Sequence, residues 1–498
     1  MDTTLRDGEQ TEGVSFSKSE KLAIAKKLLL DVKVDRIEIT SARVSQGEKE
    51  TCKEIFAWAK TKNLLEKIEV LGFVDGNKSV DWINESGGCV INLLCKGSEN
   101  HCKNQLGKTP KEHFEDIKNT MLYAQEKGFI CNAYLEDFSN GIKTNKNYVF
   151  DLIKTLNKLK ISKIYLADTL GIFSPNETTT YVTLLVKKFP KTHFEFHAHN
   201  DYNLAVANSL VAIDCGCKGV HTTINGLGER TGNTALEQVV PAINDFTKLG
   251  CGVDESRLAS ISHLLELFSK RRIAKNHPIV GDVVFTQTAG IHADGDKKGN
   301  LYISKLSPKR FGRETRYALG KLSGKSSVQM ALKSYGINLD KNVLEEVLNK
   351  VTMLGDKKEN VTKEDLLFII DEVQNHVEKK FEIIDFEVIS TKNKKPKANL
   401  KVNLLGKEFK SNSFGDGGYN AIINALTKIF DKNKLSFPKL EDYEVRIPVG
   451  GRTDALVETK IIWKRGNRKI ETIGVSTDQL EAAIIATEKM VNIILKLD

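Results

Sequence analysis

The stretch FICNAYLEDFSNGIKTNKNYVFDLIKTLNKLKISKIYLA (129–167) decides the fold of the first half of this chain. It holds two short runs of β-branched and aromatic residues, 129–135 and 163–167, on either side of an amphipathic stretch at 147–159. Parallel strands need a crossover connection, and a helix is the usual one. The stretch therefore predicts a βαβ unit and an α/β fold built on a parallel sheet.

The same alternation continues through the first part of the chain. Further β-rich runs lie at 34–40, 68–74, 90–94, 193–197 and 219–224, and an opening segment precedes them. Together with 129–135 and 163–167 these make eight candidate strands. Eight successive βα repeats predict a (β/α)8 TIM barrel, which we expect over residues 1–276.

Beyond the barrel the pattern changes twice. Residues 277–383 are rich in Gly, Lys and Arg and then show short helical patterns, so they are predicted to form small linker subdomains. Residues 384–498 contain a repeat, ANLKVNLLGKEFKSNSFGDGGYNAIINALTKIF (398–430) and LVETKIIWKRGNRKIETIGVSTDQLEAAIIATEKMVNII (456–494). Each copy is typical of two strands, a turn and a helix, which predicts a C-terminal α+β binding domain with a strand-strand-helix repeat.

Composition excludes several classes of protein. Hydrophobic residues make up 40% and charged residues 28% of the 498 positions, as in globular domains. The net charge of +9 arises from 74 basic and 65 acidic residues spread along the chain, so we expect no nucleic-acid partner. No apolar run reaches the roughly 20 residues that span a bilayer, and the N-terminus lacks a signal pattern, so a cytoplasmic protein without membrane contact is expected.

The chemistry of such a barrel lies at the carboxyl ends of its strands, because the loops there converge on one mouth. His197 and His199 end one predicted strand and, being two residues apart, point to the same face. An isolated pair of this kind is about as often two hydrogen-bonded core histidines. Asp7 and Asn233 add oxygen donors at other strand ends, and this set suits a catalytic divalent metal.

Three motifs carry a family resemblance. DTTLRDGEQ (2–10), HAHNDYNLAVANSL (197–210) and NGLGERTGNTALE (225–237) resemble the metal-dependent, acyl-CoA Claisen-condensing synthases that include 2-isopropylmalate, homocitrate and citramalate synthases. The likeness continues through 287–302, 311–327 and 443–458, so that it covers nearly the whole chain. In detail the chain is most similar to the citramalate synthases, which condense pyruvate with acetyl-CoA.

The resemblance implies a role for each matching residue. It implies a divalent metal, Mn²⁺ or Mg²⁺ with Zn²⁺ as an alternative, on Asp7, His197, His199 and Asn233. It implies acid-base and supporting roles for Arg6, Glu136, His292, Asp294 and Tyr302. The residues that it places around the substrates are Arg6, Asp7, Leu71, Leu94, Tyr134, Thr169, Asn300 and Leu301. In this family the linker reaches the barrel mouth of a second subunit, which implies a homodimer.

The implied reaction gives (R)-citramalate and CoA, the first step of a threonine-independent route to isoleucine. Three bulky side chains, Leu71, Leu94 and Tyr134, leave room for the methyl group of pyruvate but little for an isopropyl group, unless they are generic barrel core. A 2-isopropylmalate synthase that uses 2-ketoisovalerate is the main alternative. A lyase of the same barrel type and an inactive amino-acid sensor are the others, disfavoured by the terminal repeat and by the complete set of site residues, respectively.

The terminal domain resembles the allosteric amino-acid domain of the family, which implies feedback control by isoleucine. Asn420 stands where relatives carry Asp, and Thr477 where a proline is common, so the response is expected to be weakened or altered. Only Met1 precedes the DTTLRDG motif, so the first strand is expected to be short. The predicted effector residues are Tyr419, Asn420, Leu440, Tyr443, Ile447, Val457, Thr477 and Gln479.

Overall fold

The computed structural model describes residues 1–287, 301, 304–317, 328–329, 331–332, 337, 339–356, 361, 366, 369–370, 373, 380–446, 457–466 and 468–497. The chain divides into two compact units, Met1–Phe285 with Ser304–Glu314 and Thr286–Ile303 with Thr315–Asp498. Among the described residues, no helix combines the length and the apolar character that a membrane span requires.

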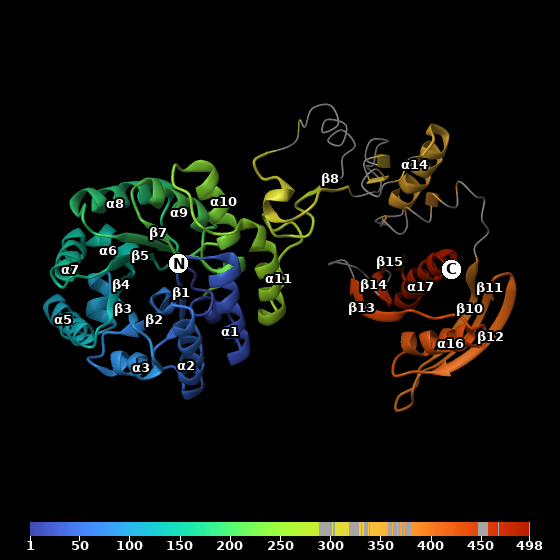
Figure 1. The fold of residues 1–498 in the computed structure, drawn as a ribbon, viewed down its shortest axis with the longest axis horizontal. Coiled ribbons are helices and arrows are strands. Elements are labelled where there is room, and N and C mark those ends of the chain that lie inside the picture. The colour runs from blue at the N-terminus through green and yellow to red at the C-terminus, as the bar shows by residue number, and fades with distance from the viewer. Residues whose placement is uncertain are drawn as a thin grey trace. The chain divides into compact units, whose positions relative to one another are not determined.

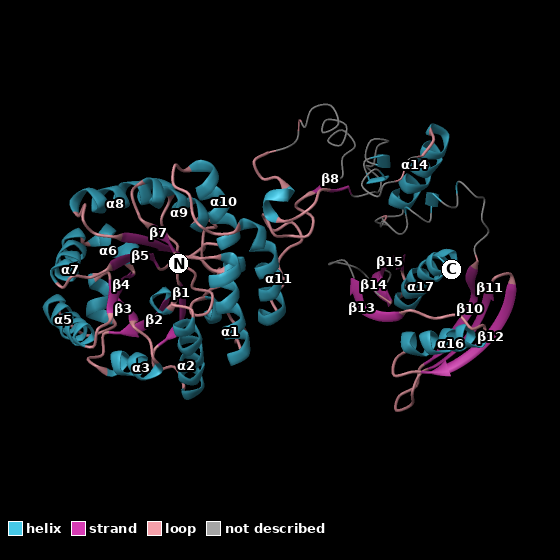
Figure 2. Cartoon of the chain, in the orientation of Figure 1, coloured by secondary structure: helices cyan, strands magenta, loops and turns pink. Residues whose placement is uncertain are grey.

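The first unit confirms the predicted TIM barrel. Parallel strands follow one another around a ring in sequence order, and helices cover its outside (Figures 1 and 2). The strands described in residues 1–285 are β1 (Ile37–Ser41), β2 (Ile68–Phe73), β3 (Val90–Lys96), β4 (Ile130–Glu136), β5 (Lys163–Asp168), β6 (Phe194–Ala198) and β7 (Gly219–Val220). The longer helices are α1 (Lys18–Lys26), α2 (Gln46–Thr61), α3 (Lys78–Ser86), α5 (Pro110–Glu126), α7 (Lys146–Lys158), α8 (Pro175–Lys188), α9 (Ala205–Asp214), α10 (Leu236–Phe246) and α11 (Leu258–Ser269).

The unit from β4 to β5 shows why the sequence folds in this way. The side chain of Asn145 caps α7 by accepting the backbone N–H of Tyr148. The helix then buries one face, whose residues recur at helical spacing. Burying each apolar side chain of this face contributes roughly 1.5–3 kcal/mol, and together these side chains pack α7 against the sheet. The buried residues are Tyr148, Val149, Leu152, Ile153 and Leu156.

The opening segment closes the ring. Asp2 forms parallel bridges with Ile37 of β1 and with Thr222, just beyond β7, so the N-terminus lies between the first and last strands (Figure 1). The Thr3 N–H donates to the Thr222 carbonyl at 2.7 Å, and the Glu38 N–H donates to the Asp2 carbonyl at 2.8 Å. The predicted first strand is therefore present as a short bridged segment between β1 and β7. The predicted strand 219–224 is also shorter, because the Thr223 N–H bonds to the Thr234 carbonyl instead of to a neighbouring strand.

The second unit contains the predicted repeat, but each copy has three strands instead of two (Figure 2). The additional strands, β10 and β13, precede the copies that the sequence pattern indicated. Both contain a register shift, between Ile383 and Asp385 and between Leu440 and Asp442, which breaks the regular alternation. The first copy is β10 (Phe381–Ile389), β11 (Lys397–Leu404), β12 (Lys407–Phe414) and α16 (Gly418–Lys432); the second is β13 (Lys439–Arg446), β14 (Val457–Arg465), β15 (Arg468–Ser476) and α17 (Gln479–Leu497).

A smaller apolar cluster lies between the barrel and the repeat in sequence. The helix α14 (Lys341–Asp356) contributes Leu344, Val347 and Val351 to it. Two further short strands, β8 (Thr286–Gln287) and β9 (Arg316–Tyr317), pair in parallel. The intervening segment 304–314 packs on the first unit, where Arg310 forms ion pairs with Asp245 and Glu255.

Candidate functional site

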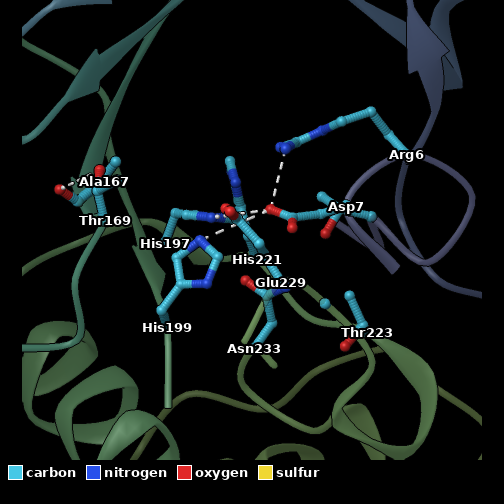
Figure 3. Close-up of polar contacts among 12 residues, drawn as sticks. Arg6, Asp7, Ala167, Thr169, His197, His199, His221, Thr223, Glu229 and Asn233 are labelled. Carbon is cyan, nitrogen blue, oxygen red and sulfur yellow. Dashed lines mark hydrogen bonds and ion pairs between the residues drawn. The ribbon is translucent and has the colours of Figure 1, made fainter. Parts of the chain in front are cut away.

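The strand ends of the barrel bring the predicted polar side chains to one place (Figure 3). His197 lies on β6, Glu136 ends β4, and Asp7 comes from the closing segment, directly before a short helix, η1 (Gly8–Gln10). These side chains line a cavity of about 190 Å³. Its lining consists of Arg6, Asp7, Gln10, Leu71, Leu94, Tyr134, Glu136, Ala167, Thr169, His197, His199 and Glu229.

Asp7, His197 and His199 point toward one another in this cavity (Figure 3). Oδ2 of Asp7 lies 3.3 Å from Nε2 of His197 and 3.9 Å from Nε2 of His199. All three residues are buried, and one donor atom of each lies within 4.8 Å of the others. A divalent ion with bonds of about 2.0–2.2 Å to nitrogen and oxygen can reach three donors at this spacing. The structure thus brings together the three main predicted metal ligands.

The electrostatics of these groups suit cation binding. Burial alone would raise the pKa of Asp7, but the Arg6 guanidinium and the hydrogen bond with His197 hold that pKa well below its usual range. Burial lowers the pKa of His199 to about 4. At neutral pH the cavity therefore presents an ionised carboxylate and a neutral imidazole, the forms in which both groups bind metals.

Asn233 completes the oxygen donors. Its Nδ2 donates to the Leu227 carbonyl at 3.1 Å, which leaves Oδ1 on the other side of the amide. Oδ1 of Asn233 and Oδ1 of Asp7 are buried and accept no hydrogen bond from the residues that the structure describes. Buried acceptors without a donor are rare in folded proteins. A bound cation would satisfy both oxygens, so the donor set fits a divalent metal.

The glycine-rich loop after β7 holds Asn233 in place. Asn233 forms an antiparallel bridge with His199, and the Thr234 N–H donates to the Ala198 carbonyl at 3.1 Å. Gly228 has φ +150°, and a Cβ there would lie 2.0 Å from Nδ2 of Asn233. Any larger residue at position 228 would therefore displace the Asn233 amide.

Arg6 spans the cavity wall through three hydrogen bonds. Its Nε donates to Oε2 of Glu38 at 2.6 Å, Nη1 donates to Asp7 at 2.9 Å, and Nη2 donates to the Tyr134 hydroxyl at 3.0 Å. Burial would lower the pKa of Arg6, but the carboxylates of Glu38 and Asp7 raise it well above its ordinary value. The guanidinium is thus a fixed positive charge beside the three proposed metal ligands.

Glu136 and Thr169 also line the cavity. Glu136 forms an ion pair with Lys96 on the neighbouring strand β3. The Thr169 hydroxyl accepts the Asp137 N–H at 2.9 Å, which ties the end of β5 to the end of β4. Leu71 and Tyr134 are buried in one apolar cluster, and Leu94 packs against it. The three predicted substrate walls therefore line the same cavity.

Sequence reasoning missed three residues around this cavity. Glu38 is fully buried and accepts hydrogen bonds from Arg6, Tyr134 and Asn92. Lys96 pairs with Glu136, and Nδ1 of His221 lies 3.1 Å from the Tyr134 hydroxyl. The available signal was a charged or imidazole side chain within a predicted strand, such as Glu38 between Ile37 and Ile39.

The other predicted catalytic and substrate-binding residues belong to the second unit, and the structure does not test their roles. Leu301 is 71% exposed. His292, Asp294, Asn300 and Tyr302 lie outside the described residues. The structure therefore gives no position for the predicted second acid-base group.

In the second unit, Tyr419 and Tyr443 of the predicted effector site are in contact, with ring centroids 5.0 Å apart. Burial raises the pKa of Tyr443, while a hydrogen bond with Gln479 opposes the shift. Oδ1 of exposed Asn420 accepts the Asp416 N–H at 3.0 Å. Of the remaining residues, Val457 is buried, Leu440 and Thr477 are exposed, and Ile447 lies outside the described residues.

Comparison with known proteins first gives the class. Residues 1–265 match the HMGL-like family, residues 279–359 match the homocitrate synthase post-HMGL domain-like family, and residues 360–495 match the LeuA allosteric (dimerisation) domain. Among solved structures, hydroxymethylglutaryl-CoA lyase from Pseudomonas aeruginosa is 18% identical, with a TM-score of 0.49 over 57% of this chain and 96% of that one. The match over residues 1–265 places the barrel in the HMGL-like family.

Full-length relatives then define the family. The (R)-citramalate synthase of Methanocaldococcus jannaschii is 32% identical over 502 residues, which cover 99% of each chain. The 2-isopropylmalate synthase of the same organism is 32% identical over 503 residues, 99% of this chain and 94% of that protein. The chain belongs to the family of acyl-condensing synthases that contains both enzymes, and it is a transferase that forms a carbon-carbon bond.

Proposed function

We propose that this enzyme condenses acetyl-CoA with pyruvate and hydrolyses the resulting thioester, giving (R)-citramalate and CoA. The observation that carries the proposal is the convergence of Asp7, His197 and His199 beside Arg6 in one small cavity, part of whose lining is apolar. Asp7, His197, His199 and Asn233 would hold the divalent metal, Mn²⁺ or Mg²⁺ with Zn²⁺ as an alternative. When bound, the ion supplies a Lewis acid for the keto carbonyl.

The residues of the chain have distinct tasks in this proposal. Arg6 uses three of its five N–H groups on Glu38, Asp7 and Tyr134, which leaves donors for the oxygen on which negative charge develops. Glu136, held by Lys96, would take a methyl proton from acetyl-CoA. Thr169 would bind the keto acid. His292, with Asp294 and Tyr302, would return a proton and assist thioester hydrolysis.

The apolar walls favour a small keto acid. Leu71 and Tyr134 are 5% and 2% exposed and adjoin Leu94 in one cluster, so the walls cannot retreat without unpacking the barrel core. Sequence identity does not choose between pyruvate and 2-ketoisovalerate, since relatives of both kinds are 32% identical. The 2-isopropylmalate synthase reaction is the second candidate for that reason.

The match to the LeuA allosteric (dimerisation) domain supports the proposed assembly and regulation. We assign the chain to a homodimer in which Asn300, Leu301 and the neighbouring linker residues serve the site of the second subunit. Isoleucine is the proposed effector, and it would act on the Tyr419–Tyr443 pair as the end product of the route that this reaction opens.

A thiol-release assay tests the proposal directly. The full-length enzyme is given acetyl-CoA with pyruvate, 2-ketoisovalerate or 2-ketoglutarate, each with and without a chelator and after readdition of Mn²⁺. We expect the fastest CoA release with pyruvate, no release after chelation, and recovery with Mn²⁺. Faster turnover of 2-ketoisovalerate would overturn the substrate assignment, and full activity after chelation would overturn the metal site.

A further inference from the structure

Lys21 on α1 is a fully buried lysine whose ammonium group lies behind the Arg6–Asp7 turn. Its residue exposure is 0%. Nζ lies 2.6 Å from Oε2 of Glu9, 3.4 Å from the Leu5 carbonyl and 3.5 Å from the Ile39 carbonyl. It also forms an ion pair with Glu48 of α2. Lys21 is not among the residues that line the cavity.

Two of these contacts bracket the functional turn. The Leu5 carbonyl belongs to the peptide that enters Arg6, and Glu9 follows Asp7 by two residues. Glu9 is itself held, because its Oε1 accepts the Phe16 N–H at 2.8 Å. The ammonium group of Lys21 therefore contacts the turn on both sides of Asp7.

The other two contacts belong to the scaffold. Ile39 lies on β1 and Glu48 on α2, so the turn is tied through one ammonium group to a barrel strand and to an outer helix. Burying an ammonium group is costly unless its donors are paired. Two apolar side chains at positions 21 and 48 would pack α1 against α2 without the cost of burying an ammonium group. They could not, however, bind the Leu5 carbonyl and Glu9.

We propose that Lys21 is a positioning residue, which sets the placement of Arg6 and Asp7 relative to His197 and His199. It acts through the turn and does not touch substrate. The inference rests on the metal site proposed above. It predicts that losing the contact of Lys21 with the turn lowers metal affinity by more than losing its contact with the scaffold.

The test is a Mn²⁺ titration of the full-length protein, in which electron paramagnetic resonance measures free Mn²⁺. Lys21→Met removes all four contacts, and Glu9→Gln weakens only the pair on the side of the turn. Glu48→Gln is the matched control, because it weakens the same kind of pair on the side of the scaffold. We expect Lys21→Met and Glu9→Gln to raise the Kd for Mn²⁺ by roughly tenfold or more, with Glu48→Gln within about twofold of wild type.

A kinetic measurement separates positioning from folding. At saturating Mn²⁺, Glu9→Gln is expected to lower kcat with little change in the KM for acetyl-CoA, while Glu48→Gln lowers only Tm. If Lys21→Met does not fold, Glu9→Gln carries the comparison. Equal Mn²⁺ affinity in wild type and Glu9→Gln, or an equal loss in Glu48→Gln, would overturn the inference. Failure of the wild-type protein to bind Mn²⁺ would overturn the proposed function as well.

Discussion

Replacing Glu38 by Gln should remove most of the catalytic activity, although Glu38 does not line the cavity. Oε2 of Glu38 accepts from Arg6 at 2.6 Å and from Tyr134 at 3.1 Å, and Oε1 accepts from Asn92 at 2.7 Å. All three partners are donors, so the amide group of Gln must face at least one of them with its own N–H. Asn92 cannot turn over freely, because its Oδ1 accepts from Asn132.

The size of the effect follows from burial. Removing one partner of a buried ion pair costs about 3–5 kcal/mol of stability. Losing one preorganised donor to developing negative charge costs roughly 10²–10³ in kcat. Since Glu38 is the carboxylate that holds Nε of Arg6, the guanidinium is expected to shift in Glu38→Gln, with a fall in kcat of that order. The thiol-release assay at saturating pyruvate, acetyl-CoA and Mn²⁺ measures it.

Glu69→Gln is the matched control. Glu69 is equally buried and binds Arg36 and the Tyr165 hydroxyl inside the same barrel, but neither it nor these two partners line the cavity. Glu69→Gln should lose about as much stability as Glu38→Gln, but the folded Glu69→Gln protein should keep the wild-type kcat. If the two variants lose Tm equally and their kcat values agree within about threefold, the assignment of Glu38 as the support of Arg6 is wrong.

Three further predictions concern the apolar part of the cavity, the proposed metal site and His113, a buried residue of α5 whose Nε2 accepts the Lys96 N–H at 3.1 Å. Leu94→Ala opens the apolar wall, so the ratio of kcat/KM for 2-ketoisovalerate over pyruvate should rise by about 10–200-fold, and an unchanged ratio would contradict the pocket assignment. Asn233→Ala removes a buried oxygen donor and should raise the Kd for Mn²⁺ about tenfold, with recovery in Asn233→Asp; titration calorimetry tests both. Burial lowers the pKa of His113 to about 4, so the unfolded chain binds this proton below about pH 6.5 and the folded chain only below about pH 4. The free energy of unfolding should therefore fall by up to about 3 kcal/mol as pH drops through that window, and urea titrations of His113→Gln should lack this component.

Periodicity was enough to predict the barrel, because hydrophobic pattern and local propensity agree in units such as 129–167. It did not predict which residues pair with one another at the closure of the barrel, or the additional strands of the second unit. The opening segment is bridged through Asp2 to Ile37 of β1 and to Thr222, and no run of apolar residues in the sequence indicates those contacts. The same holds for β10 and β13, whose register shifts interrupt the alternation that reveals a strand.

The candidate site divides in the same way. His197 and His199 share a face because side chains alternate along a strand, so their cooperation could be predicted from spacing alone. Their convergence with Asp7 depends on a ring that closes between residues 2 and 222, and Asn233 joins them through a bridge to His199. Lys21 and Glu38 support the site from within elements that sequence patterns treat as ordinary helix and strand.

The sequence by itself therefore determined the class of fold, the family and the chemical types gathered at the strand ends, because these depend on local periodicity and on motifs of adjacent residues. Only the tertiary structure decided which carboxylate faces which cation. Such partners as Arg6 and Glu38 or Lys96 and Glu136 lie 32 and 40 residues apart. Lys96 meets Glu136 because β3 and β4 run parallel in register, and Arg6 reaches Glu38 because the opening segment pairs with β1 through Asp2. Burial then makes an unpaired charge costly in both places.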